Sequence, residues 1–244
     1  MIALFGLMTS CQQQESSLRI MSYNIRNLRG MDDVRNVGRV AKVINEAKPD
    51  VVAVQEVDSV TGRSEQTDVL GLLATETQMY PTYAAAIDYD GGKYGVGILS
   101  REEPLSYYSI PLPGREEQRV LLVVEFDHYL FACTHLSLTE EDRLRSLPLL
   151  NQEAAKANKP LFIAGDWNAT PNSSFIGELR QSFTLLSDPG QLTFPADTPN
   201  RTLDYVAIYR TKDLAVNVKS TQVVDEPMAS DHRPVVVELT LTAK

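Results

Sequence analysis

The sequence predicts an α/β fold, because two stretches far apart in the chain follow the same plan. In each, a segment with helical spacing leads through Lys-Pro into a short apolar strand, and an acid follows the strand. The first strand covers residues 51–54 and is followed by Glu56, and the second covers residues 161–164 and is followed by Asp166. Ligands of open α/β sheets bind outside the carboxyl ends of strands, so both acids are predicted to face one crevice.

Length and composition indicate one ordinary globular domain. The chain has 244 residues, of which 43% are hydrophobic and 23% charged, which suffices for one substantial core but is short for two. No linker divides the chain, so we expect a single catalytic domain over residues 18–244. The net charge of −9 argues against a protein that grips long stretches of nucleic-acid backbone, because clustered Lys and Arg provide that grip.

The first 17 residues are predicted to be a lipoprotein signal and tether. Residues 1–10 are too short to span a bilayer but have the length of the apolar part of a signal peptide. Met8-Thr-Ser-Cys11 resembles a bacterial lipobox, in which the cysteine is acylated. We therefore expect a cell-envelope lipoprotein, periplasmic or on the outer surface, anchored to the membrane through Cys11; the alternative is an unmodified apolar N-terminus. Cys133 lies in an apolar strand and is expected to be buried, without a disulfide.

Alternation, spacing and turn residues predict the order of the elements. Asp32 and Asp33 are expected to open the first helix, since acids favour the amino end of the helix dipole. The sequence Asp-Gly-Gly at residues 90–92 predicts a hairpin turn. Thr139 begins a capping-box pattern for the longest helix, which Pro148 should kink or break. The predicted strands cover residues 18–24, 51–54, 83–87, 94–100, 118–126, 129–134, 161–164, 203–209, 215–224 and 235–241. The first predicted helix begins near residue 33, and the other three cover residues 68–79, 139–158 and 173–181.

Polar side chains lie at the ends of several predicted strands. Burying an unpaired carboxylate is costly, so an acid at such a position usually serves a metal, a cation or a reaction. The alternative for each position is a turn-forming or capping residue. Arg63 could contact a phosphate or be a solvated loop charge, and we favour the second interpretation. The candidate site residues are Asn24, Glu56, Tyr94, Arg119, His135, Asp166, Asn168, Asp204, Asp231 and His232.

The chemistry of this set fits the hydrolysis of a phosphate ester. Oxygen ligands without a Cys/His cluster suit a hard cation such as Mg²⁺, with Mn²⁺ or Ca²⁺ as substitutes. The sequence has neither a glycine-rich phosphate loop nor a Ser or Cys nucleophile motif. In such a site the cation and an arginine neutralise the phosphoryl oxygens, while an Asp or His activates water.

Six short motifs, in order, resemble those of the endonuclease/exonuclease/phosphatase superfamily, the fold of pancreatic-type deoxyribonucleases. The resemblance extends from about residue 18 to residue 242 and implies a four-layered α/β sandwich, in which helices flank two packed mixed β-sheets. The motifs are Tyr23-Asn24, Gln55-Glu56, Thr134-His135, Gly165-Asp166-Trp167-Asn168, Leu203-Asp204-Tyr205 and Ser230-Asp231-His232.

The resemblance also implies a role for each candidate. Glu56 would be the principal metal ligand, with Asn24 and Asp231 beside it. Asp166 and Asn168 would position or deprotonate the attacking water and stabilise the transition state.

The resemblance further implies that His232, oriented by Asp204, would act on the phosphate or as general base. His135 would be a general acid or a phosphate ligand. Arg119 and Tyr94 would contact the scissile phosphate.

The fold does not select a substrate. We expect a Mg²⁺-dependent phosphodiesterase or phosphatase that acts as a monomer on a small-molecule or lipid-derived phosphoester. Asp32 and the residues at 62–64, 88–92 and 94–95 resemble those of a small bacterial branch of the superfamily, near proteins linked to lipid-anchor remodelling. One alternative is a true nuclease acting on DNA or RNA, which the acidic balance disfavours. The other is a catalytically silent lipoprotein that binds phosphoesters.

Overall fold

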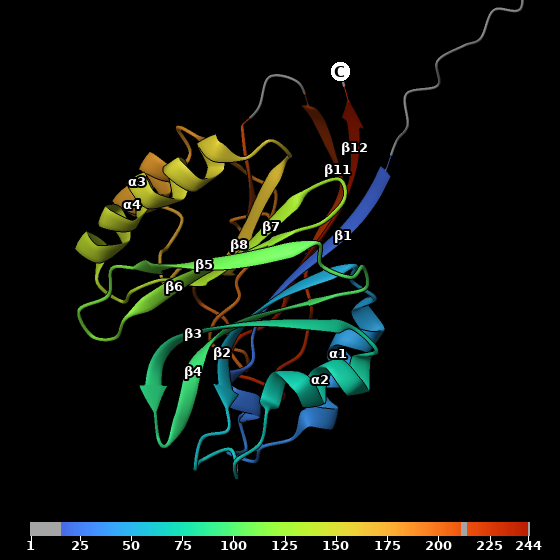
Figure 1. Ribbon diagram of the computed structural model, residues 1–244, viewed down its shortest axis with the longest axis vertical. Helices are drawn as coiled ribbons and strands as arrows, with labels where there is room; N and C mark the ends of the chain where they lie inside the picture. Colours follow the sequence, from blue (N-terminus) through green and yellow to red (C-terminus); the bar gives the residue numbers. More distant parts are fainter. Residues whose placement is uncertain (1–15, 211–213, 244) are drawn as a thin grey trace, which may run out of the picture.

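Two six-stranded mixed β-sheets pack face to face in the computed structural model, which describes residues 16–210 and 214–243 (Figure 1). The first sheet has the order β11 (Leu214–Val223), β12 (Val235–Ala243), β1 (Ser16–Asn24), β2 (Val51–Ser59), β4 (Gly92–Ser100) and β3 (Tyr80–Tyr89). The second has the order β5 (Ser106–Leu112), β6 (Arg119–Glu125), β7 (Leu130–His135), β8 (Leu161–Asp166), β10 (Asp204–Tyr209) and β9 (Phe183–Leu185).

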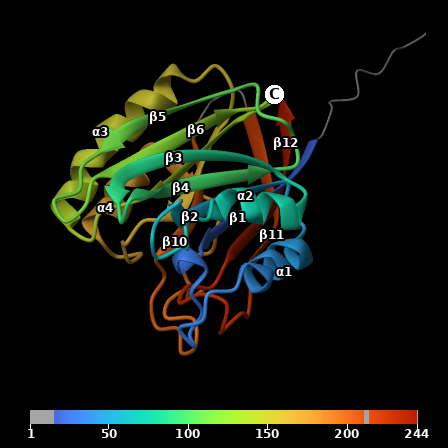
Figure 2. The ribbon, with the colours of Figure 1, turned by 60° about the horizontal axis from the view of Figure 1, so that its bottom comes forward.

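Helices cover the outer face of each sheet. The first sheet carries α1 (Val37–Ala47) and α2 (Val69–Thr77), and a short 3₁₀ turn, η1 (Arg26–Leu28), follows β1. The second sheet carries α3 (Glu140–Lys156) and α4 (Ser174–Leu179). The turned view separates the two helical layers on opposite sides of the sheets (Figure 2).

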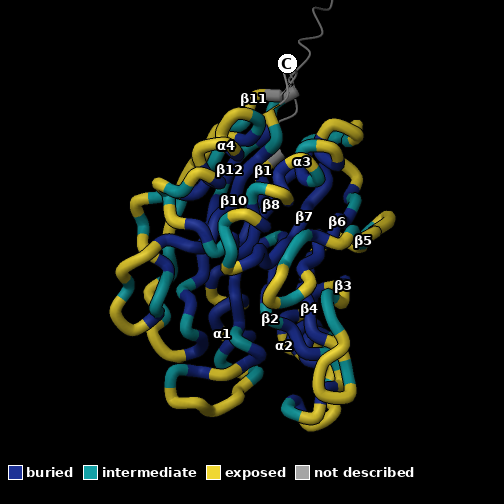
Figure 3. The backbone as a smooth tube through the Cα atoms, turned by 90° about the vertical axis from the view of Figure 1, so that its left-hand side faces the viewer, coloured by how far each residue is buried: buried dark blue, intermediate teal, exposed yellow. Residues whose placement is uncertain are grey.

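Three apolar clusters fill the spaces between the four layers. Alternation along β1 divides its side chains between two of them: Leu18 and Ile20 pack between the sheets, whereas Met21 and Tyr23 pack against the α1/α2 layer. The third cluster lies between the second sheet and α3/α4. The strands form the buried centre, and exposed backbone is concentrated in the connecting loops (Figure 3). The four-layered sandwich implied by the sequence resemblance is confirmed.

The first helix begins later than predicted. It starts at Val37, where the Asn36 side chain accepts a hydrogen bond from the backbone N–H of Arg39. Asp33 has a φ of 59°, which places it in a turn. Asp32 forms an ion pair with the Arg39 guanidinium at 2.6 Å. Asparagine is among the best residues at the N-cap, and here it takes that position from the two acids.

The longest helix also differs in detail from its prediction. It continues through Pro148 without a break, because the buried Leu147 and Leu150 hold this face against the second sheet. Thr139 provides no side-chain cap. Asp142, the acid three residues after Thr139 in the capping-box pattern, pairs with the Arg115 guanidinium at 2.9 Å.

Two strands were not predicted. Strand β5 contains Pro111, which argues against a central strand but is compatible with an edge strand, the position that β5 occupies. Strand β9 has only three residues, too few to show a period.

The cysteine predictions have different outcomes. Cys133 is fully buried in β7, as predicted. Cys11 and the proposed lipobox lie outside the described residues. Within the part of the chain that the structure describes, no helix combines the length and the apolar character needed to cross a bilayer.

Gly165 should be the least replaceable glycine near the site. A Cβ atom at Gly165 would overlap the carbonyl oxygen of Thr134, which pairs with it on β7. We expect Gly165→Ala to lower the free energy of unfolding by about 3 kcal/mol, because the strands must separate. Gly177 in α4 has open space around it, so Gly177→Ala should be neutral or stabilising by up to about 1 kcal/mol. Urea unfolding measures both, and equal stability of the two variants would contradict this close packing.

Candidate active site

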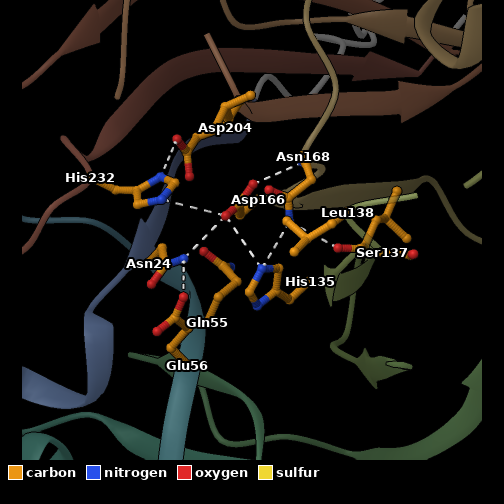
Figure 4. Close-up of polar contacts among 12 residues, drawn as sticks. Asn24, Gln55, Glu56, His135, Ser137, Leu138, Asp166, Asn168, Asp204 and His232 are labelled. Carbon is orange, nitrogen blue, oxygen red and sulfur yellow. Dashed lines mark hydrogen bonds and ion pairs between the residues drawn. The ribbon is translucent and has the colours of Figure 1, made fainter. Parts of the chain in front are cut away.

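Strand register brings three predicted residues side by side on the second sheet. His135 on β7 is the parallel partner of Asp166 on β8, and Asp204 on β10 is its antiparallel partner. On the first sheet, Asn24 at the end of β1 lies beside Gln55 on β2. The side chains of Asn24, His135 and Asp166, at the carboxyl ends of these two parallel pairs, converge as the repeated strand plan predicted (Figure 4).

A β-bulge directs Glu56 into the same place. Strand β2 does not end before Glu56 but continues to Ser59, and its register with β4 shifts between Val54 and Val57. Glu56 has a φ of 59°, an uncommon conformation for a residue other than glycine and one that is often found at functional sites. Gln55 donates to the Cys133 sulfur at 3.4 Å in the core. The bulge thus allows Gln55 to contact the core while the adjacent Glu56 faces the pocket.

Asp166 lies at the centre of the polar network. Its Oδ1 accepts from the backbone N–H of Asn168 at 2.9 Å, and its Oδ2 accepts from Asn24 Nδ2 at 3.1 Å. Asn24 Nδ2 also donates to Glu56 Oε1 at 3.0 Å, so one amide bridges carboxylates of the two sheets (Figure 4). The Nε2 atoms of His135 and His232 lie 3.4 and 3.6 Å from Asp166 Oδ2.

The two histidines have opposite protonation states at neutral pH. His232 Nδ1 lies 2.9 Å from Asp204 Oδ2. Burial lowers the pKa of His232, but the carboxylates of Asp204 and Asp166 outweigh it and raise the pKa to about 10. Burial lowers the pKa of His135 to about 4, opposed by Asp166 and reinforced by Arg119. His232 is therefore an imidazolium with a proton to donate, and His135 is neutral.

Neutral His135 accepts a hydrogen bond. Its Nε2 lies 3.0 Å from Asn168 Nδ2, which also donates to the carbonyl of Leu136 at 2.9 Å. His135 therefore orients the Asn168 carboxamide beside Asp166.

The network opens into a pocket of about 380 Å³. Asn24 and Asp204 lie beneath the pocket and contact residues that line it, so the structure brings all the predicted site residues together. Burial raises the pKa of Tyr94, and nearby Glu56 and Glu117 raise it further, so the hydroxyl remains a donor. The predicted residues that line the pocket are Glu56, Tyr94, Arg119, His135, Asp166, Asn168, Asp231 and His232.

The charge distribution indicates where a divalent cation fits. Ligand atoms of Asp166, Asp204 and His232 lie within 4.8 Å of one another, but the His232 imidazolium already compensates this group. Among the described residues, Glu56 has no Lys, Arg or His within ion-pair distance. Burial raises the pKa of Glu56, the Asn24 hydrogen bond opposes this, and Asp231 and Asp166 raise it further. An uncompensated carboxylate suits a hard cation, so Glu56 fits the predicted metal site better than the His232 group does. Asp231 lines the same pocket, and its Oδ2 lies 3.6 Å from Arg26 Nε.

The predicted ligand Asn24 has a second function in this structure. Its Nδ2 donates hydrogen bonds to the carboxylates of Glu56 and Asp166, and its Oδ1 accepts one from the backbone N–H of Arg26 at 3.0 Å. An amide oxygen has two lone pairs, so one remains for a cation. Its role as a ligand stays a prediction.

Arg63 has neither of the roles considered from the sequence. Its Nε and Nη2 donate to the two oxygens of the fully buried Asp58, both at 2.7 Å. The guanidinium carbon lies 4.3 Å from the Tyr89 ring centroid and 5.3 Å from that of Tyr94. Arg63 is thus a half-buried structural cation that contacts a ring lining the pocket.

Several pocket residues were not predicted. Phe194 lies with its ring 4.7 Å from the His232 ring, and Arg201 lies over Phe194 at 4.9 Å. Leu138 and Glu117 also line the pocket. No sequence pattern marks Phe194 and Arg201, because they meet only through an isolated bridge in an irregular segment.

Comparison with known proteins identifies the family. Residues 21–232 match the model of the Endonuclease/Exonuclease/phosphatase family. No curated protein matches the chain.

Solved structures show the same fold. An endonuclease/exonuclease/phosphatase from Beutenbergia cavernae DSM 12333 has a TM-score of 0.75 and 23% identity over 93% of this chain and 72% of that one. One from Bacteroides vulgatus has a TM-score of 0.76 and 18% identity over 92% and 98%. A mannosyl-6-phosphatase from Bacteroides thetaiotaomicron VPI-5482 has a TM-score of 0.71 and 17% identity over 91% and 99%.

Proposed function

Because the chain belongs to the endonuclease/exonuclease/phosphatase family, we propose that it hydrolyses phosphate esters with the help of a divalent cation, Mg²⁺. The family includes phosphatases, phosphodiesterases and nucleases. The observation that carries the proposal is the environment of Asp166, whose carboxylate is fixed by Asn24 and Asn168 and faces two histidines in opposite protonation states. Such a constellation can hold a water molecule and donate a proton or hydrogen bond beside it.

In the proposed reaction, the acidic side chain of Asp166 orients the water, and the protonated His232 contacts the phosphoryl group. Asp166 accepts a hydrogen bond from the attacking water and orients it, with the Asn168 carboxamide beside it. His232 is too basic to be a general base at neutral pH, so it donates to a phosphoryl oxygen while Asp204 fixes its ring. A divalent cation bound by Glu56 and Asp231 would supply further positive charge for the phosphoryl oxygens.

Arg119 and Tyr94 form the other side of the proposed phosphate site. Both line the pocket, and each presents hydrogen-bond donors. Arg119 is 6% exposed and paired with Glu117 at 3.1 Å, so its position is fixed before a substrate binds. Preorganised donors of this kind stabilise developing charge without reorganisation.

Release of p-nitrophenolate tests the proposal. The wild-type protein should cleave p-nitrophenyl phosphate or bis-p-nitrophenyl phosphate with Mg²⁺, lose this activity in EDTA and regain it with added Mg²⁺. His232→Ala should lower kcat by about 10²-fold or more, the contribution typical of a positioned proton donor.

His128→Ala is the matched control, because that histidine is 71% exposed and precedes β7 at the end opposite His135. Its kcat should equal that of the wild type. Turnover that survives both EDTA and the His232 substitution would overturn the proposal. Nicking of plasmid DNA at an efficiency comparable with ester cleavage would favour a nuclease instead.

A further inference from the structure

Two guanidinium groups line the pocket, and their surroundings differ. Arg119 is buried and forms ion pairs with Glu117 at 3.1 Å and Glu116 at 3.4 Å. Arg201 is exposed at the pocket mouth, and no carboxylate of residues 16–210 or 214–243 lies within ion-pair distance of it. Arg119 is therefore already neutralised by the protein, whereas Arg201 is not.

Arg201 is held in place although its charge is unpaired. Its guanidinium lies over the ring of Phe194 at 4.9 Å, and the two residues exchange backbone hydrogen bonds of 3.0 Å in both directions. The centroid of the His232 imidazole also lies 4.7 Å from that of the Phe194 ring. The backbone N–H of Ala196 donates to the carbonyl of Asp231 at 2.7 Å, which ties this segment to the site.

The contact with the Phe194 ring leaves the N–H donors of Arg201 available. A guanidinium holds these donors in one plane, so it can make a bidentate contact with a carboxylate or phosphate. A fixed fork loses less conformational entropy on binding than a freely moving side chain. The other exposed residue in the lining, Leu138, is apolar and offers no side-chain donor.

The acidic side chains of the pocket explain why an anionic substrate group would need the unpaired guanidinium of Arg201. Carboxylates of Glu56, Glu117, Asp166 and Asp231 line it. An anionic group that entered beside the scissile phosphate would be repelled by these acids unless a cation met it. A neutral group would gain less from Arg201, because hydrogen bonds between a guanidinium and an ionised acceptor are the stronger ones.

We propose that Arg201 is a specificity-determining residue that binds a second anionic group of the substrate, a carboxylate or a further phosphate, close to the scissile ester. This inference rests on the proposed phosphoester hydrolysis and deepens it. The preferred substrates are then phosphoesters whose alcohol part is itself negatively charged.

Matched substrate pairs test the proposal, each pair differing by one carboxylate. The monoester pair is 3-phosphoglycerate and glycerol 3-phosphate. The diester pair is glycerophosphoserine and glycerophosphoethanolamine. The pair used is the one whose class the wild-type protein hydrolyses with Mg²⁺, and the readout is the ratio of kcat/KM for the carboxylate-bearing substrate to that for its partner.

The wild-type ratio should favour the carboxylate-bearing substrate by about tenfold, the size of one good charge-assisted contact. Arg201→Gln should bring the ratio close to one, and Arg201→Lys should restore part of it, because the charge returns without the fork. Arg210→Gln is the control, because this exposed arginine lies beyond the far end of β10, about 20 Å along the strand from Asp204.

A wild-type ratio near one, or a ratio that Arg201→Gln leaves unchanged, would overturn the role of Arg201. Failure of the proposed function looks different, since the wild-type protein would then hydrolyse neither member of either pair. In that case the dissociation constants of the same pairs, measured by calorimetry on wild-type and Arg201→Gln protein, still decide whether Arg201 binds the carboxylate.

Discussion

Replacement of Asp166 by asparagine should lower kcat on a nitrophenyl phosphate ester by about 10³-fold, within the range for loss of a positioned general base. The wild-type carboxylate accepts hydrogen bonds from Asn24 Nδ2 and from the backbone N–H of Asn168. An asparagine can keep the second of these, but it then turns its own amide donors toward Asn24. The position that orients water therefore loses both its acceptor character and its negative charge.

Steady-state kinetics with Mg²⁺ measures this effect, and circular dichroism checks that the variant folds. Asp127→Asn is the matched control, because Asp127 is 70% exposed and also faces a histidine, His128, at 3.2 Å. The control should keep wild-type kcat. An Asp166→Asn variant that retains more than about a tenth of wild-type activity would remove Asp166 from the chemistry.

Replacement of Asp204 by asparagine should destabilise the protein by about 3 kcal/mol at pH 7, because it leaves the buried His232 without its closest carboxylate. The sign follows from the pKa of His232, which is raised to about 10 in the folded protein. The stabilisation that accompanies this raised pKa is fully present below about pH 6.5, the pKa of a histidine in the unfolded chain. It is lost as the pH rises through about 10, the pKa in the folded protein. The stability difference between wild type and Asp204→Asn should therefore be largest near pH 6.5 and shrink toward pH 10.

Urea unfolding between pH 6.5 and pH 10, with EDTA present, measures this difference. Asp127→Asn again serves as the control, since an exposed ion pair contributes little to stability. The same Asp204→Asn variant should lose about 10²-fold in kcat, because His232 loses the group that orients its ring. A stability difference that does not vary with pH would show that Asp204 does not hold the proton on His232.

Patterns in the sequence predicted most strands and the polar residues at their ends, and the resemblance of six motifs to a known family implied the four layers. Strands were recognisable because their side chains alternate or are continuously apolar, and this pattern is local. The acids that follow residues 51–54 and 161–164 were recognisable because an acid next to a buried strand needs a partner. Parallel strands present their carboxyl ends at one edge, so the convergence of Glu56 and Asp166 could be predicted as well.

The orientation and charge of each site residue depend on long-range contacts that the sequence does not show. Glu56 faces the pocket because of a bulge between Val54 and Val57, which depends on pairing with β4. His135 and His232 differ in charge because different groups from distant segments surround each imidazole.

Two arginines show the same limit, since the role of Arg63 was predicted wrongly and Arg201 was not recognised at all. Arg63 is a half-buried partner of Asp58, and among the described residues Arg201 is a cation without an ion-pair partner that lies on Phe194. Nothing in the residues adjacent to either one reports this difference. The charge state and role of a polar side chain depend on which groups come within a few ångströms of it, and long-range contacts set those distances.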